Sequence, residues 1–375
     1  MAANIATVAF PPFHGGNTGS IPVGRASKIG HFCDFLARRA PPACPWSGGQ
    51  PPGASPARAA GAGQTCAGDH ARPSAAPPAR AAPRLARRLS DIIGCTRHMI
   101  RWRPLVAASP FGSEAAGEKI IKFFSRHLVG LTIRYKYRKE AHQPARFKAF
   151  SGTLIILQDV VCFLTAGHIL KEIEEARSSE EVEIEAASLV DTLGAKPVSD
   201  VPIPFDLKNA HLIYVDDDAA GLDFGVIPLR PHYVHLLAKN GVVALAEENW
   251  IKQHTINYDV YWMLGFPEEL TSERISPPRD TSVQAIMFGV KKLDAAPDRR
   301  SPTEYPQFVG QLDPALSLNS IKGMSGGPIF GFKLMPNGQL RYWIVALQTS
   351  WERETRTVYG CSVPVLASLL TAPPN

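Results

Sequence analysis

The sequence predicts an all-β fold, a β-sandwich or a β-barrel, with a short N-terminal helix and a C-terminal helix. After residue 128 the chain is a succession of short apolar segments with turn signals between them, which is typical of both architectures. Apolar residues at helical spacing predict an amphipathic helix over 114–127, with Ser113 as its N-cap. The segment PVLASLL near the end of the chain predicts the second helix.

The expected strands begin with VGLTIRYKY, in which Val129, Leu131 and Ile133 alternate with their neighbours as in a half-buried strand. The others, in chain order, are SGTLIIL, VVCFLTA, AHLIYV, FGVIPL, VVALA, YDVYWMLGF, SVQAIMFGV, GGPIFGF, RYWIVALQ and TVYGCSVPV. The segment ILKEIEEARSSEEVEIEA is expected to be a helical acidic insertion with a solvated face, or else a regulatory or partner-binding element. HYVH is expected to be a solvent-facing strand or turn and not a metal-binding pair.

Composition divides the chain into a disordered tail over 1–110 and one domain over 111–375. Of the first 100 residues, 46 are Ala, Pro or Gly, and such segments bury too little to offset the entropy of ordering. Residues 1–100 hold 11 Lys and Arg against 3 Asp and Glu, whereas the remainder holds 29 against 31. The basic character therefore belongs to the tail, and no nucleic-acid partner is expected.

Several further classes of protein are not expected. No apolar run approaches the roughly 18–20 residues of a membrane-spanning helix, so no membrane association is expected. None of the six cysteines forms a C-x-x-C pair, so no zinc site is expected. The two isolated cysteines outside the tail do not indicate a secreted disulfide framework. The start of the chain shows no clear signal peptide, so the cytoplasm is the expected compartment, with organelle targeting by the Arg-rich tail left open.

Three short motifs suggest a catalytic site. FLTAGHIL carries His168, GLDFGVIPL carries Asp223 and GMSGGPIF carries Ser325, with 55 and 102 residues between successive members. The order His, Asp, Ser is that of the serine-nucleophile triad in chymotrypsin-type β-barrels. Asp223 is favoured over the neighbouring turn residues 216–218, also aspartates, because an apolar strand follows it. A Gly-rich hairpin turn with an exposed serine is the alternative for Ser325, and a half-buried histidine at a strand end is the alternative for His168.

The chemistry explains these residue types. A serine hydroxyl becomes a strong nucleophile only when a base takes its proton, and His168 is the expected base. Asp223 is expected to hold the imidazole tautomer and to stabilise the imidazolium. The N–H groups of Gly323 and Ser325 are expected to form the oxyanion hole. Glycine at 323 permits backbone angles that a Cβ penalises.

The chain from about 125 to 370 resembles the chymotrypsin/trypsin superfamily of serine proteases. TAGH looks like the family's Thr-Ala-Ala-His, DFGVIPL like its Asp-Leu-Ala-Val-x-x-Leu, and GMSGGPIF like its Gly-x-Ser-Gly-Gly-Pro. YWIVALQTS and YGCSVPV resemble strands of the bacterial Deg-type branch. The resemblance implies two packed antiparallel β-barrels, with His168 and Asp223 from the first and Ser325 from the second. It also implies a serine endopeptidase that takes a polypeptide substrate and no metal or organic cofactor, with a regulatory partner protein as a possibility.

The departures from the family pattern carry further expectations. Met324 replaces the aspartate that zymogen-type trypsins use for activation, so activation by N-terminal cleavage is not expected. Gly167 replaces an alanine, which the resemblance presents as a mild change. By the family pattern, Asn319, Ala346 and Gln348 are the candidate substrate-binding residues, and the neutral Asn319 implies no strict preference for Arg or Lys. Support for Asp223 is expected to differ from the family's.

Two other function classes compete with this interpretation. The first is a catalytically silent trypsin-fold module that binds peptides or partners, although no member of the triad is missing here. The second is an acyl hydrolase of the α/β-hydrolase type, which is disfavoured because that class places its serine between a strand and a helix and orders its triad Ser, Asp, His. The DFG triplet does not indicate a kinase, because neither a Gly-rich phosphate loop nor a His-Arg-Asp loop accompanies it.

Overall fold

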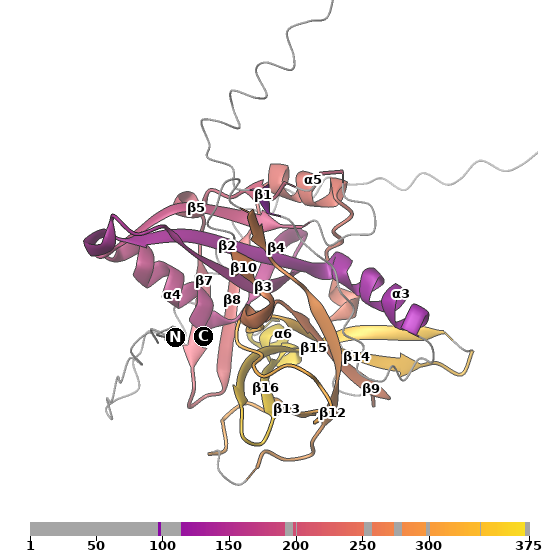
Figure 1. The fold of residues 1–375 in the computed structure, drawn as a ribbon. Helices are drawn as coiled ribbons and strands as arrows, with labels where there is room; N and C mark the ends of the chain where they lie inside the picture. The colour runs from indigo at the N-terminus through magenta and orange to yellow at the C-terminus, as the bar shows by residue number, and fades with distance from the viewer. Residues whose placement is uncertain are drawn as a thin grey trace, which may run out of the picture.

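The computed structural model describes residues 97–98, 114–191, 198–199, 201–250, 257–273, 280–297, 301–337 and 339–371. Within these ranges it confirms the predicted all-β class: two antiparallel β units carry short helices on their surface (Figure 1). The predicted disordered tail over 1–110 lies outside the described residues, apart from Arg97 and His98. These two residues form strand β1, which pairs in parallel with β11 (Asp280–Ser282), itself paired with β10 (Ser272–Glu273).

The first unit is a seven-stranded antiparallel sheet. In pairing order its strands are β6 (Ile203–Pro204), β5 (Val182–Val190), β2 (Leu128–Tyr137), β3 (Arg146–Leu157), β4 (Val160–Thr165), β8 (Leu222–Pro228) and β7 (Ile213–Asp217). Thr165 pairs with Gly225 across β4 and β8, so the residues that follow β4 lie beside the start of β8. This register brings His168 and Asp223 together, although 55 residues separate them.

The second unit is a closed six-stranded barrel, drawn in orange and yellow in Figure 1. Around the barrel its strands are β12 (Ile286–Lys292), β13 (Gln307–Leu312), β16 (Thr357–Ser362), β15 (Leu340–Glu352), β14 (Pro328–Leu334) and β9 (Val260–Gly265). Ser325 precedes β14, which pairs with β9 on one side and β15 on the other. The serine therefore sits at one end of this barrel.

The remaining described elements are helical. They are α3 (Glu114–Phe124), α4 (Gly167–Ser178), α5 (Pro231–Lys239), α6 (Val363–Thr371) and the 3₁₀ turns η1 (Ser125–His127), η2 (Arg138–Glu140), η3 (Leu207–Asn209), η4 (Glu247–Asn249) and η5 (Glu268–Leu270). Helices α3 and α6 confirm the two predicted helices, while Ser113 lies outside the described residues. None of the helices in the described ranges is long and apolar enough to cross a membrane.

Three apolar clusters make up the core. One fills the first unit, with Leu131 and Phe163 among its members, and another fills the barrel around Phe288. The third lies between the units, where Leu164 of the first sheet packs with Trp262 of the barrel and with residues of α3 and α6. Fully burying a large apolar side chain contributes about 1.5–3 kcal/mol. Because the third cluster joins both units, the relative position of the motifs on either side is set by a packed core.

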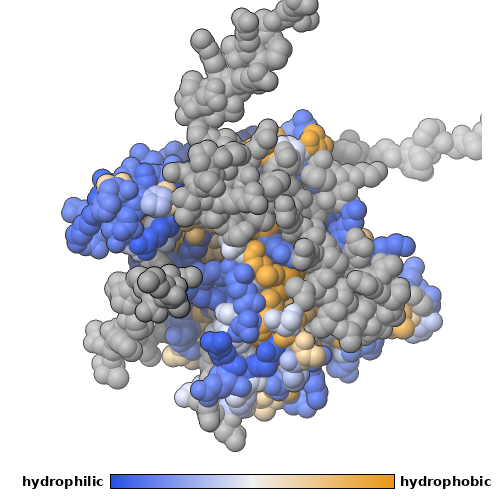
Figure 2. All heavy atoms as spheres, in the orientation of Figure 1, coloured by the Kyte–Doolittle hydropathy of each residue, from blue (hydrophilic) through white to orange (hydrophobic). Residues whose placement is uncertain are grey.

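The acidic segment after His168 was expected to be helical throughout, and this prediction is wrong for its second half. Helix α4 ends at Ser178, and strand β5 begins at Val182. In VEIEA the half-buried Val182 and Ile184 alternate with exposed glutamates, which is the period of a strand, and β5 pairs with β2. Figure 2 shows a hydrophilic surface where Figure 1 places α4 and the outer end of β5, as expected for a solvated face.

Two other expectations are wrong. HYVH lies in helix α5, which begins at Pro231 in the first helical position and buries Tyr233 and Leu237 four residues apart. VVALA is not a strand; its only ladder contact in the described chain is an isolated bridge between Leu245 and Ile155. The other expected strands are all present. Short apolar runs do not by themselves distinguish a strand from a buried helix or an extended loop.

Candidate active site

His168 lies where β4 passes into α4. Thr165 ends the strand, Ala166 is the extended N-cap, and His168 is the second residue of the helix. Gly167 lies against the backbone of β7 so closely that a Cβ built on it would be 2.0 Å from the carbonyl oxygen of Val215. The expectation that glycine for alanine is a mild change here is therefore wrong, because this chain has no room for the methyl group.

Asp223 holds His168 through both carboxylate oxygens. Its Oδ1 accepts a hydrogen bond from the His168 backbone N–H at 2.8 Å, and its Oδ2 accepts one from His168 Nδ1 at 2.7 Å. The first N–H groups of a helix have no partner inside the helix, so Asp223 also caps α4. With Nδ1 donating to a carboxylate, Nε2 is left as the unprotonated nitrogen of the neutral ring. The imidazole is thus held in the tautomer that a general base requires.

The neighbouring aspartates have other partners. Asp216 accepts a hydrogen bond from Lys171 Nζ at 2.8 Å, and Asp217 Oδ1 accepts one from the backbone N–H of Ala220. Asp218 is exposed in the turn. Among these candidates, Asp223 is the residue whose side chain bonds His168. In the described chain both hydrogen bonds to Asp223 come from His168.

The electrostatic surroundings raise the pKa of His168. Burial lowers the pKa of His168, but the hydrogen bond and charge of Asp223, with the charges of Asp216 and Glu172, raise it by more. The pKa of His168 therefore lies above its usual value near 6.5. An imidazole in this setting takes up a proton readily.

Ser325 and His168 line the same cavity of about 210 Å³. The Ser325 hydroxyl donates to the backbone oxygen of Thr349 at 3.3 Å, and no hydrogen bond joins it to His168 among the described residues. Catalytic hydrogen bonds in substrate-free enzymes are often long or poorly aligned and form only in the complex. A rotation of Ser325 between staggered χ1 positions redirects its hydroxyl without any backbone change.

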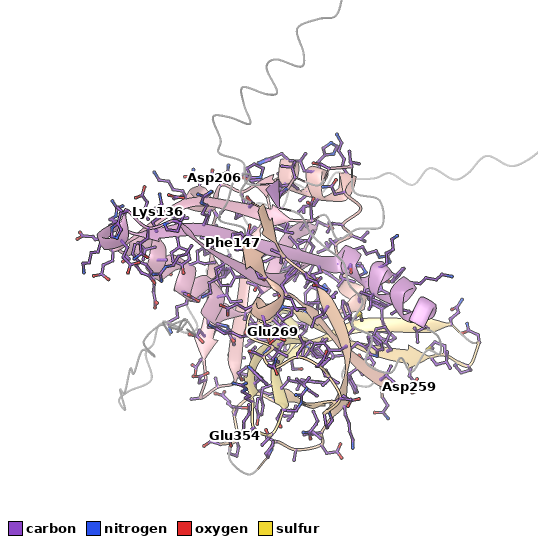
Figure 3. All side chains as sticks on the ribbon, in the orientation of Figure 1. Lys136, Phe147, Asp206, Asp259, Glu269 and Glu354 are labelled. Carbon is purple, nitrogen blue, oxygen red and sulfur yellow. The ribbon has the colours of Figure 1, made fainter. Side chains whose placement is uncertain are left out.

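The cavity combines apolar and charged walls. It is lined by Phe147, Lys148, Ala149, Phe150, His168, Ile169, Glu172, Glu268, Thr271, Lys322, Gly323 and Ser325. Two ion pairs belong to these walls, Lys148 with Glu172 and Lys322 with Glu268. In Figure 3 the labelled Phe147, from the first unit, and Glu269, from the second, lie on the face where the units meet.

The glycines around Ser325 serve close packing as well as access. Gly326 has φ +82°, and a Cβ on it would be 2.0 Å from Thr165 Oγ1 and 2.5 Å from the Ser151 carbonyl oxygen. Gly323 has φ +89°, where a side chain is strained. Neither the N–H of Gly323 nor that of Ser325 donates a hydrogen bond to any residue described in the structure. Both groups are therefore available to an oxyanion.

The candidate substrate-binding residues do not line this cavity. Asn319 is exposed, and the backbone N–H groups of Asn319 and Ser320 donate to the Glu269 carboxylate. Ala346 and Gln348 are buried in β15, and Gln348 Oε1 has no hydrogen-bond partner in the described part of the chain. Their roles stay predictions. Met324 is fully buried in the apolar cluster of the barrel, whereas the zymogen-type aspartate at this position carries a charge.

Comparison with known proteins gives a partial likeness of fold. No protein-family model matches this chain, and no curated protein sequence matches it significantly. The thermostable serine protease AL20 from an extremophilic microorganism is 11% identical, with a TM-score of 0.37 over 64% of this chain and 92% of that one. Protease Anisep from Arthrobacter nicotinovorans is 13% identical, with a TM-score of 0.35 over 63% and 90%. A Glu endopeptidase is 15% identical, with a TM-score of 0.33 over 64% and 87%.

Proposed function

We propose that this protein is a serine endopeptidase that acts through an acyl-enzyme on Ser325. The observation that carries the proposal is that Asp223 accepts hydrogen bonds from both the backbone N–H and the ring of His168. His168 lines a cavity that Ser325 and Gly323 also line. If His168 and Asp223 had only structural roles, the ring would not need to be held with Nδ1 protonated and Nε2 free. A serine at the same cavity would not be needed either. Met324, in place of the aspartate of zymogen-type trypsins, supports a site that needs no N-terminal cleavage. The strand motifs YWIVALQTS and YGCSVPV support an assignment to the Deg-type branch.

The proposed reaction follows from these atoms. Ser325 Oγ attacks the carbonyl carbon of a peptide bond while His168 Nε2 takes the hydroxyl proton. Asp223 stabilises the imidazolium, and the N–H groups of Gly323 and Ser325 bind the oxyanion. The C–N bond then breaks, and His168 returns the proton to the leaving amine. Water, activated by His168, hydrolyses the ester and restores Ser325.

A second candidate is a silent binding module with the same fold. The observation in its favour is the direction of the Ser325 hydroxyl, which donates to Thr349 and not to His168. In such a module the cavity binds a peptide without cleaving it. The two candidates differ in one measurable property, the nucleophilicity of Ser325.

Labelling of the purified full chain with a fluorophosphonate probe tests the proposal. We expect labelling of the wild-type protein at Ser325, located by mass spectrometry, and none in Ser325→Ala or His168→Ala. Ser368→Ala is the matched control, because Ser368 is exposed on α6 and its hydroxyl donates to the backbone oxygen of Pro364 within that helix. A folded wild-type protein that stays unlabelled would favour the silent module. Labelling that persists in His168→Ala would refute the assignment of the base.

A further inference from the structure

The loop that carries the oxyanion donors is held by groups outside the triad. This oxyanion loop, residues 321–325, contains the two peptide groups on either side of Gly323. We propose that Ser151, on strand β3 of the first unit, is a positioning residue that holds the oxyanion loop with its donors free. The inference rests on the proposed function and extends it to a residue in neither the triad nor the oxyanion hole.

Ser151 links three segments by hydrogen bonds: β3, the residue that follows β9, and the oxyanion loop. Its hydroxyl accepts a hydrogen bond from the backbone N–H of Phe266 at 2.9 Å and donates one to the backbone oxygen of Gly323 at 3.1 Å. A hydroxyl has a single proton, so accepting from Phe266 leaves that proton for Gly323. Ser151 is fully buried, so water does not compete for these bonds. The bridge therefore fixes the direction of the Gly323 carbonyl.

A second hydrogen bond fixes the preceding peptide group. The carbonyl oxygen of Lys322 accepts from the backbone N–H of Glu268 at 2.7 Å. In a planar trans peptide the N–H points opposite to the carbonyl, so the N–H of Gly323 points away from the Glu268 backbone. Both peptide groups of Gly323 are thus clamped, one by Glu268 and one by Ser151. Ser151 is the clamp that a single side-chain substitution can remove.

The loop's own hydrogen bonds run from the N–H of Met324 to the Ile321 oxygen and from the N–H of Gly327 to the Met324 oxygen, and they leave the Gly323 carbonyl to be held from outside the loop. Glycine visits both signs of φ readily, so the peptide groups at Gly323 can rotate unless they are held. Met324 packs among apolar residues, and apolar packing has no preferred direction. The two peptide groups that carry the donors are held by the Glu268 N–H on the Lys322 oxygen and by the Gly327 N–H on the Met324 oxygen. Ser151 holds the Gly323–Met324 peptide that joins them.

The test compares Ser151→Ala with Ser125→Ala in the full chain. Ser125 is also fully buried, and its hydroxyl donates to a backbone oxygen, that of Ile121 at 2.8 Å, far from the site. For each variant and for wild type we would measure three quantities: the limiting rate of fluorophosphonate labelling, the probe concentration at half that rate, and the melting temperature. Losing one oxyanion donor typically costs about 10²–10³ in rate, so releasing the peptide that joins the two donor-bearing peptides, with both donors still present, should cost roughly 10- to 100-fold.

We expect Ser151→Ala to lower the limiting rate with little change in half-limiting concentration or in the pH midpoint set by His168. Ser151→Cys keeps a weak hydrogen-bond donor, so its limiting rate should lie between those of Ser151→Ala and wild type. Ser125→Ala should label at the wild-type rate. A wild-type limiting rate in Ser151→Ala would overturn the proposal, and so would an equal loss in Ser125→Ala.

Hydrogen exchange provides a readout that does not need activity. The amides of Met324 and Gly327 donate within this turn, so exchange of a peptide covering 321–327 reports how firmly it is held. We expect faster exchange there in Ser151→Ala and not in Ser125→Ala. If the wild-type protein is never labelled, the proposed function fails, and hydrogen exchange alone then tests the role of Ser151. Equal exchange in the two variants overturns that role. Faster exchange in Ser151→Ala supports it.

Discussion

Gly167→Ala is the substitution on which the family resemblance and the structure disagree most sharply. The resemblance presents alanine as the ordinary residue before the catalytic histidine. In this chain a Cβ on Gly167 would lie 2.0 Å from the carbonyl oxygen of Val215 and 2.9 Å from that of Phe224. Both are backbone atoms of the paired strands β7 and β8, so no side chain can turn away to make room.

The size of the effect follows from these distances. Ordinary contact begins near 3.4 Å, so the methyl group and Val215 must separate by about 1.4 Å. Overpacking of this kind costs roughly 1–3 kcal/mol. The gain in helix propensity from glycine to alanine, at most about 1 kcal/mol, does not offset the larger part of that range. Because Phe224 follows Asp223, moving β8 also separates Asp223 from His168, and a misplacement of about 1 Å can cost about 10²-fold in rate.

The assay is the fluorophosphonate labelling rate together with the melting temperature. We expect Gly167→Ala to lose about 10²-fold in rate and several degrees in melting temperature. Gly289→Ala is the matched control, because Gly289 lies on β12 with no other atom within 4 Å of its built Cβ. It should resemble wild type in both measurements. A Gly167→Ala protein with wild-type stability and labelling rate would refute the steric argument and restore the expectation drawn from the family.

Two further predictions concern the pair of Asp223 and His168. Asp223→Asn should lower the labelling rate by a factor on the order of 10⁴ with little loss of fold. The reason is that the amide can donate to Nδ1 and so favours the tautomer that is protonated on Nε2. A rate within tenfold of wild type would show that Asp223 does not set the tautomer. The wild-type rate should fall as the pH falls through the pKa of His168, since only the neutral ring accepts the proton. That midpoint should lie above 6.5, because Asp223 raises the pKa of His168, and a rate that is unchanged between pH 8 and pH 5 would argue against His168 as the base.

Much of the arrangement could be predicted from local sequence patterns. Alternation in VGLTIRYKY and helical spacing over 114–127 reflect which side chains face the core, and both predictions are confirmed by β2 and α3. The errors arose where a pattern was ambiguous. Charge suggested helix for the segment that became β5, although its period of two already favoured a strand. HYVH carried too short a pattern to reveal that Tyr233 and Leu237 face the core from one helix.

Local motifs were enough to identify the reactive groups: a serine, a histidine and an aspartate in the order of the triad, and a glycine at the proposed oxyanion donor. How these groups are held depends on contacts between distant segments. Asp223, and not its neighbours, bonds the ring of His168. The Val215 backbone leaves no room for a side chain at Gly167. Ser151 of the first unit donates a hydrogen bond to Gly323 of the second. These contacts join residues from 48 to 172 positions apart, and no local pattern encodes them. They exist because the apolar cluster between the two units fixes how the sheets meet.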